Sequence, residues 1–154
     1  MVKIKIVATG QEKDKNINSA IADFKKRISR FAKISIVFVD EFPQKNESEI
    51  VVSKEKESVN QLKNFEGFTF VLDSTGKTFS SEELAKKIDN IMLANSTITF
   101  IIGGSCGLSE KVKEKADCLL SFGKITFPHE LMRLVLAEQI YRAFTINNNL
   151  PYHK

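Results

Sequence analysis

No apolar run in this sequence is long enough to cross a bilayer, and cysteine is scarce, with only Cys106 and Cys118 present. Neither cysteine has a histidine or another cysteine at the spacing of metal ligands, so we expect no metal site and no structural zinc. Residues 1–6 alternate charged and apolar side chains, which predicts a strand and not a signal peptide. Two thiols without a secretion signal indicate a reducing cytoplasm and no disulfide, and no membrane partner is expected.

Strand and helix signals alternate along the 154 residues, a length that suits one domain spanning residues 1–154. After the N-terminal strand, apolar runs predict strands at 34–39, 68–72, 97–102 and 118–121. Helices are predicted at 15–29, 47–63, 80–93, 109–116 and 128–147, with Ser80 and Ser109 as caps. The 47–63 helix is expected to be exposed and amphipathic, with the apolar residues Ile50, Val51, Val59 and Leu62. This order predicts an α/β fold, with a mainly parallel sheet flanked by helices.

The helix at 128–147 is apolar on every side. Pro128 suits its first position, and its apolar residues point in all directions on a helical wheel: Leu131, Leu134, Val135, Leu136 and Ile140. A helix that is apolar all round is expected to be buried all round. One sheet face covers only one side of a helix, so we expect a second copy of the chain, and therefore a homodimer.

Two polar pairs interrupt this apolar helix. His129 and Arg133 are four residues apart, and so are Glu138 and Arg142, with the acid before the base as in favourable helical ion pairs. Charges set into apolar faces are usually paired or functional. Surface ion pairs with a capping histidine and a functional cluster therefore both stay open at this point.

A run of five bases without an acid occurs near the helix at 15–29: Lys25, Lys26, Arg27, Arg30 and Lys33. Lys26 and Arg30 lie opposite the apolar stripe of that helix on a wheel, and the net charge of the chain is +4. Such a row can neutralise RNA phosphates. A solvated lysine face is the alternative interpretation.

Three predicted strand ends carry ligand-binding features. Residues 72–73, 103–104 and 121–127 follow successive strands, and ligands of open α/β sheets bind beyond the carboxyl ends of the strands. The glycines at 103–107 let the backbone approach a ligand closely. This loop is not a P-loop, because the Gly-Lys-Ser/Thr ending is missing. It is also not a dinucleotide-binding fingerprint, because such a motif normally follows the first strand and this loop follows a late one.

The start of the last helix and the end of the chain carry a resemblance. Residues 126–129 read Thr-Phe-Pro-His, followed by Arg133, Glu138-Gln139, Tyr141-Arg142-Ala143 and, at 151–154, Pro-Tyr-His-Lys. This pattern resembles the bacterial enzymes that methylate N3 of a pseudouridine in large-subunit (23S) ribosomal RNA, within the SPOUT class. The resemblance covers essentially the whole chain. It implies a C-terminal trefoil knot, which sequence patterns alone argue against, and S-adenosylmethionine bound in a bent shape.

The resemblance also implies roles for individual residues. The expected cofactor contacts are Leu72, Gly103, Phe122, Gly123, Lys124, Ile125, Thr126 and Phe127. Phe122 and Ile125 would pack on the adenine, while backbone groups read its polar edge. The chain has Phe-Gly-Lys-Ile where relatives often show Phe-Ser-Lys-Met or Leu-Ser-x-Leu, so Gly123 can contact the cofactor only through its backbone.

For the methyl transfer itself, the resemblance implies a base and a positive charge close to the target nitrogen. His153 is the expected proton acceptor, Arg142 stabilises the anion, and Tyr152 stacks on the flipped base. The expected substrate contacts are His129, Arg133 and Lys154, together with Lys26 and Arg30. A chain end is flexible by default, yet this one is expected to fold over the cofactor pocket of the partner subunit.

Two other functions stay open. One is a knotted methyltransferase acting on a tRNA ribose, although the chain lacks the extra RNA-binding domain of larger relatives; the other is a ribosome-associated RNA-binding protein without turnover. With one modest basic patch, the protein is expected to need the preformed surface of the ribosome, so naked RNA should be a poor substrate.

Overall fold

Five parallel strands form the centre of the computed structural model, which describes residues 1–154. They are β1 (Lys3–Thr9), β2 (Lys33–Val39), β3 (Phe68–Thr78), β4 (Thr97–Ile102) and β5 (Cys118–Ser121). Their order in the sheet is β2-β1-β4-β3-β5, and every neighbouring pair is parallel. The α/β fold with a mainly parallel sheet is therefore confirmed.

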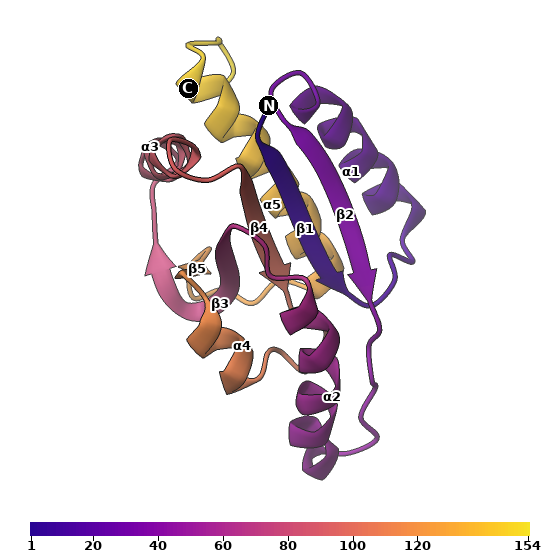
Figure 1. Cartoon of the computed structure of the whole chain (residues 1–154). Helices are drawn as coiled ribbons and strands as arrows, with labels where there is room; N and C mark the ends of the chain where they lie inside the picture. Colours follow the sequence, from indigo (N-terminus) through magenta and orange to yellow (C-terminus); the bar gives the residue numbers. More distant parts are fainter.

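Helices cover both faces of this sheet (Figure 1). They are α1 (Lys15–Ile28), α2 (Ile50–Lys63), α3 (Ser81–Met92), α4 (Glu110–Lys115) and α5 (His129–Asn147), with a 3-10 turn at Glu47–Glu49 before α2. On one face α5 lies between α1 and α3 and contacts both, while α2 and α4 cover the other face. None of the helices has the length and apolar character needed to cross a membrane.

The predicted helix starts are mostly confirmed. Ser80 forms a capping box with Glu83 at the start of α3, and Ser109 accepts the backbone N–H of Val112 in α4. Pro128 lies one residue before the position predicted for it, because its ψ of 138° is extended and the helix begins at His129.

Two hydrophobic clusters hold the layers together. The larger lies between the sheet and α1, α3 and α5, where Phe70 and Phe100 stack with ring centroids 4.9 Å apart. The smaller lies under α4 and includes Ile101 and Val112. Each cluster fills one face of β4, whose six residues are all buried.

The helix α2 exists as predicted, and its buried side is largely polar. Among its apolar residues, Leu62 packs against the smaller hydrophobic cluster. Val51 and Val59 are 68% and 53% exposed, whereas Glu57 and Gln61 are fully buried. Glu57 accepts the backbone N–H of Phe42, and Gln61 donates to the hydroxyl of Thr9, although its Oε1 has no partner. These long-range hydrogen bonds decide which side of α2 faces the sheet.

The helix α5 is also buried on one side only within this chain. Leu136 and Ile140 are fully buried against the sheet, but Leu131, Leu134 and Val135 are half-buried. Burial all round is predicted only with a second copy of the chain, and a single chain buries one side of α5. The side with these three apolar residues stays open.

Candidate functional site

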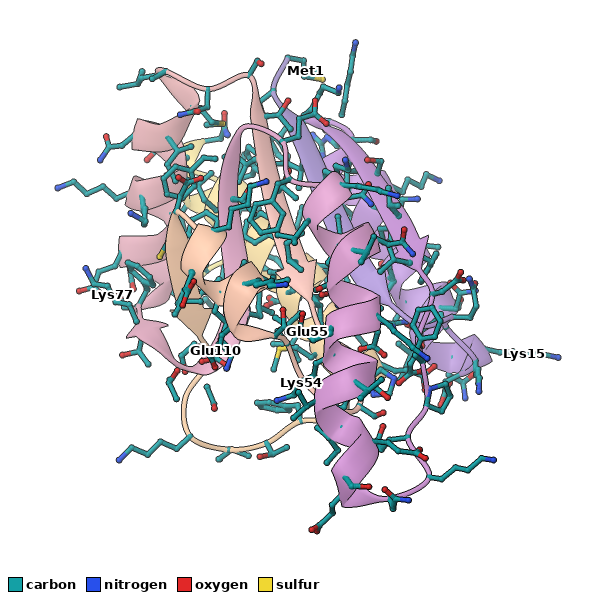
Figure 2. The ribbon with its side chains drawn as sticks, turned by 60° about the horizontal axis from the view of Figure 1, so that its bottom comes forward. Met1, Lys15, Lys54, Glu55, Lys77 and Glu110 are labelled. Carbon is teal, nitrogen blue, oxygen red and sulfur yellow. The ribbon has the colours of Figure 1, made fainter.

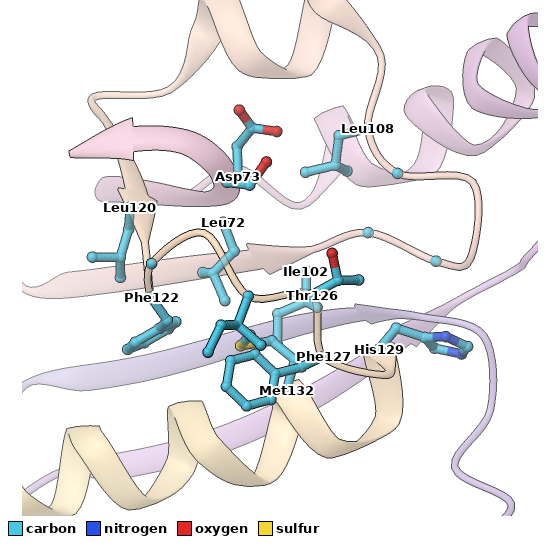
Figure 3. A pocket seen from close by; sticks show the side chains of 16 residues that line it. Leu72, Asp73, Ile102, Leu108, Leu120, Phe122, Thr126, Phe127, His129 and Met132 are labelled. Carbon is cyan, nitrogen blue, oxygen red and sulfur yellow. The ribbon is translucent and has the colours of Figure 1, made fainter. Parts of the chain in front are cut away.

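A cavity of about 230 Å³ lies at the ends of β4 and β5, beside the irregularity in β3 that follows Leu72 (Figure 3). Its walls come from residues 72–74 within β3, from the ends of β4 and β5 with the loops that follow them, and from the first turn of α5. Figure 3 shows Phe127 and Met132 on the side of α5, with Asp73 and Leu108 opposite. Parallel strands bring their carboxyl ends to one edge, which explains why segments about 30 and 20 residues apart meet here.

Seven of the eight residues predicted to bind the cofactor line this cavity: Leu72, Gly103, Phe122, Gly123, Ile125, Thr126 and Phe127. Lys124, the eighth, is exposed and does not line it. Other lining residues were not predicted as cofactor contacts, among them Ile102, Leu108 and Met132, since buried apolar side chains look the same in a sequence whether they line a cavity or fill a core. His129, predicted as a substrate contact, also lines the cavity.

The lining fits a flat heterocycle with a polar edge, such as adenine. Leu72, Phe122 and Phe127 supply apolar walls, and Gly123 has φ +105°, which an L side chain rarely adopts. The backbone N–H groups of residues 124–127 donate to no protein acceptor. They are therefore free to bind a ligand, so the residues present are compatible with the expected cofactor.

The glycine loop at 103–107 is held in place from outside. A Cβ on Gly103 would lie 2.9 Å from Cγ of Leu108, too close for an ordinary contact. Glu41 accepts hydrogen bonds from the Ser105 N–H at 3.1 Å and from its hydroxyl at 2.9 Å. Burial acts to raise the pKa of Glu41, but these hydrogen bonds outweigh it and the pKa lies below its usual value. The carboxylate therefore stays ionised and clamps the loop.

Cys106 in the same loop is not a nucleophile. Its thiol donates to Oε1 of Glu57 at 3.3 Å. Burial, followed by this hydrogen bond, raises the pKa of Cys106 to about 11, so the thiol stays protonated. Cys118 is also a free thiol, and no group of three metal-ligating side chains occurs in the structure.

A second polar cluster lies at the other end of α5. Arg142 donates from Nε and Nη2 to Oε1 of Glu138 at 3.0 and 2.6 Å, which confirms the predicted pair. Tyr152 donates its hydroxyl to the same oxygen at 3.0 Å and packs edge-on against Tyr141, with ring centroids 4.7 Å apart. Burial, followed by the hydrogen bond to Glu138, raises the pKa of Tyr152, so its phenol stays protonated. The chain end is therefore packed on α5.

His153 completes this cluster. Its Nδ1 lies 3.0 Å from Nη1 of Arg142, and its Nε2 lies 2.7 Å from Oε1 of Glu82. A guanidinium only donates hydrogen bonds, so Nδ1 accepts and the proton of the neutral ring is on Nε2, where it is donated to Glu82. The hydrogen bond from His153 lowers the pKa of Glu82. Both ring nitrogens are occupied here, so accepting a proton requires Arg142 to release Nδ1.

Arg133 does not lie where a substrate contact is expected. Its side chain is 2% exposed and donates from Nη2 to the backbone oxygens of Thr9 and Gly10, at 2.7 and 2.8 Å. Nη1 lies 3.4 Å from Oε2 of Glu12. The buried guanidinium of Arg133 is therefore not available to contact a substrate, because it donates hydrogen bonds to backbone oxygens at the end of β1.

The remaining predicted substrate residues lie on the surface. Lys26, Arg30 and Lys154 are exposed, away from the cavity. Arg27, in the same basic run, lies 5.7 Å from the ring centroid of Tyr141. The basic end of α1 is thus next to the cluster formed by Arg142, Tyr152 and His153, which we call the tail cluster.

The tail cluster and the cavity do not meet within one chain. His129 lies at the cavity end of α5, and Arg142 follows it after 13 residues, which is about 20 Å along a helix. In Figure 1 the C-terminus lies at the top, whereas β1 and β4 point to the bottom. The structure brings the predicted cofactor residues together, and the predicted catalytic residues together, but in two separate places.

A parallel α/β sheet with a ligand cavity at its carboxyl edge defines a large class of ligand-binding proteins and enzymes. Comparison with known families narrows this class, because residues 2–153 match the family described as predicted SPOUT methyltransferase. The chain belongs to the SPOUT methyltransferase family.

Named relatives resemble the chain over its full length. Proteins named Ribosomal RNA large subunit methyltransferase H are 50% identical in Lactobacillus helveticus and 45% identical in Streptococcus pneumoniae, over 99% of this chain and 100% of theirs. Among solved structures, a probable methyltransferase from Bordetella pertussis is similar in fold, with a TM-score of 0.57, 12% identity and coverage of 92% of this chain and 94% of its own. A putative methyltransferase from Legionella pneumophila, described as bound to the cofactor SAM, has a TM-score of 0.51 and 12% identity, over 92% of this chain and 66% of its own.

Proposed function

We propose that this protein uses S-adenosylmethionine to methylate N3 of a pseudouridine in large-subunit ribosomal RNA, in the cytoplasm. The observation that carries the proposal is the cavity, around which seven of the eight expected cofactor residues converge. The names of relatives at 45–50% identity support the substrate, and the described complex of the Legionella protein supports the cofactor. The segment 122–127 follows β5. We expect the family's trefoil knot where this segment passes, in space, between the loops after β3 and β4.

The active site is proposed to be shared by two chains. On a helical wheel, Leu131, Leu134 and Val135 lie on the same side of α5 as Glu138 and Arg142, within about 100° of each other. This open side is suited to a partner, and a two-fold axis that pairs two α5 helices antiparallel places the C-terminal end of one near the N-terminal end of the other. The tail cluster of one chain then lies at the cavity of its partner, although the two sites are about 20 Å apart within a single chain.

In this arrangement each tail residue has a distinct task. S-adenosylmethionine, when bound, would supply an activated methyl group to N3, with its C–S bond breaking to leave a neutral thioether. Nδ1 of His153, which Arg142 must first release, would take the N3 proton. The released guanidinium then stabilises negative charge on the imide, and the protonated phenol of Tyr152 stacks on the base.

A transfer assay tests the proposal. The protein is incubated with methyl-labelled S-adenosylmethionine and large-subunit particles, whole ribosomes, stripped ribosomal RNA or tRNA, and the modified nucleotide is mapped. We expect label on N3 of one pseudouridine, with ribosomal particles better substrates than stripped RNA. Label on a tRNA ribose would identify the alternative enzyme, and binding to ribosomes without any transfer would identify a non-catalytic protein. Equal rates on stripped RNA and particles would refute the need for a preformed surface.

A further inference from the structure

A second hollow, of about 580 Å³, lies away from the cavity, between α3 and the ends of β3. Its lining combines three lysines with two aromatic rings: Lys77, Lys86, Lys87, Phe68 and Phe79. Lys77 lies at the edge of the molecule next to α3, on the far side from α2 (Figure 2). We call this feature the α3 groove.

The α3 groove carries positive charge that the protein itself does not neutralise. None of its three lysines takes part in any of the salt bridges in the structure. Its one acidic residue, Glu83, accepts the N–H of Ser80 at 2.8 Å within the capping box. An array of free ammonium groups around a hollow is complementary to a row of phosphates.

The aromatic rings hold two of the lysines over the groove. Nζ of Lys87 lies 5.3 Å from the ring centroid of Phe68, and Nζ of Lys77 lies 5.1 Å from that of Phe79. Cation–π contacts favour these positions without using the hydrogen-bond donors of the ammonium groups. The lysines are therefore positioned and still free to donate to a phosphate.

The groove adjoins the tail cluster through a single turn of helix. Glu82 holds His153, and Lys86 lies four residues further along α3, so their Cβ atoms are about 5–6 Å apart. An RNA strand whose base is presented to His153 thus has its neighbouring phosphates within reach of Lys86. An acidic peptide is less suitable, because the rings that would contact its apolar side chains are covered by lysines.

We propose that the α3 groove binds the phosphodiester backbone of the RNA strand next to the nucleotide that is methylated. This inference rests on the proposed function and adds a second basic surface, on the other side of α5 from Lys26 and Arg30. The lysines bind and orient the substrate and take no part in the chemical step.

The test compares two triple variants of the full chain that lose the same charge. Lys77→Gln, Lys86→Gln and Lys87→Gln empty the α3 groove, whereas Lys45→Gln, Lys56→Gln and Lys63→Gln remove three exposed, unpaired lysines on the side of α2. Binding to large-subunit particles and to stripped ribosomal RNA is measured from low to moderate salt. For the groove variant we expect the slope of log affinity against log salt to fall by about 2, or about 0.7 per lost phosphate contact. The α2 variant should keep the parental slope.

Further readouts separate binding from other effects. The groove variant should raise KM for particles at least about tenfold while S-adenosylmethionine affinity, thermal unfolding and kcat at saturating particles stay at the parental values. An unchanged slope and an unchanged KM would overturn the proposal. The proposal would also be overturned if the groove variant lost affinity for particles but not for stripped RNA, because that result would indicate a ribosomal protein as the partner. If the triple variant unfolds, Lys86→Gln alone is expected to lower the slope by about 0.7. Failure of the parental protein to methylate would instead refute the proposed function, while the binding slopes would still decide whether the groove contacts RNA.

Discussion

Two inactive variants are expected to restore activity to each other if the tail of one chain completes the cavity of its partner. Gly103→Val is designed to damage the cavity, because even a Cβ at this position would lie 2.9 Å from Leu108. His153→Ala removes the proposed proton acceptor at the far end of α5. Each variant alone should methylate ribosomal particles at least about 10²-fold more slowly than the parent.

Mixing gives a defined expectation. When equal amounts are unfolded and refolded together, about half of the dimers contain one chain of each kind. If the site is built in trans, one of the two sites in a mixed dimer has neither substitution, so about one quarter of parental activity should return. If the site is built in cis, every site carries one substitution and no activity returns. The separation of about 20 Å between His129 and Arg142 on one helix favours the first outcome.

The measurement is methyl transfer to ribosomal particles by the co-refolded mixture, with each variant refolded alone as the control. S-adenosylmethionine affinity should be lost in Gly103→Val and kept in His153→Ala, because His153 is not part of the cavity. A mixture no more active than its components, although the mixed dimer is shown to form, would refute the shared site.

Four shorter predictions concern single parts of the structure. Removing residues 151–154 should leave the fold intact but cost about 2 kcal/mol, since the hydrogen bond and the edge-on contact of Tyr152 are lost; denaturant unfolding measures this, and undiminished methyl transfer would contradict the role of the tail. His153→Gln keeps hydrogen-bonding groups but cannot accept the proton, so single-turnover rates should fall about 10²–10⁴-fold with cofactor affinity unchanged, and a near-parental rate would leave only the charge of Arg142. Leu134→Glu should yield folded monomers in sedimentation, whereas Val51→Glu, at a position 68% exposed, should not change the assembly. Burial raises the pKa of Glu57 above 4.5, so the stability linked to its proton is present below that value and is lost as pH rises through the folded pKa. The stability of Glu57→Gln relative to the parent should therefore increase as pH rises above 4.5, and a difference that stays constant with pH would contradict this.

Local signals in the sequence predicted much of the fold. Ser80 and Glu83 are three residues apart and cap α3 through contacts within one turn, and Glu138 and Arg142 are neighbours on any helix. The segments at 72, 103 and 121 met at one edge because parallel strands require it, although β3 does not end at residue 72 as predicted but continues past an irregularity to Thr78. The detailed roles of the cavity and tail residues, by contrast, came from the family resemblance and not from these patterns.

Contacts between distant segments decided the rest. Arg133 is buried because it faces the backbone oxygens of Thr9 and Gly10, more than 100 residues earlier, and no helical pattern contains that information. Likewise, Glu57 and not Val59 faces the sheet, because its hydrogen-bond partners lie in other segments. The sequence by itself determined the elements and their order, since these depend on neighbours along the chain. Only the tertiary structure decided which side of α2 is buried, and that the tail cluster lies a helix length away from the cavity, because both depend on packing and hydrogen bonds between residues far apart in sequence.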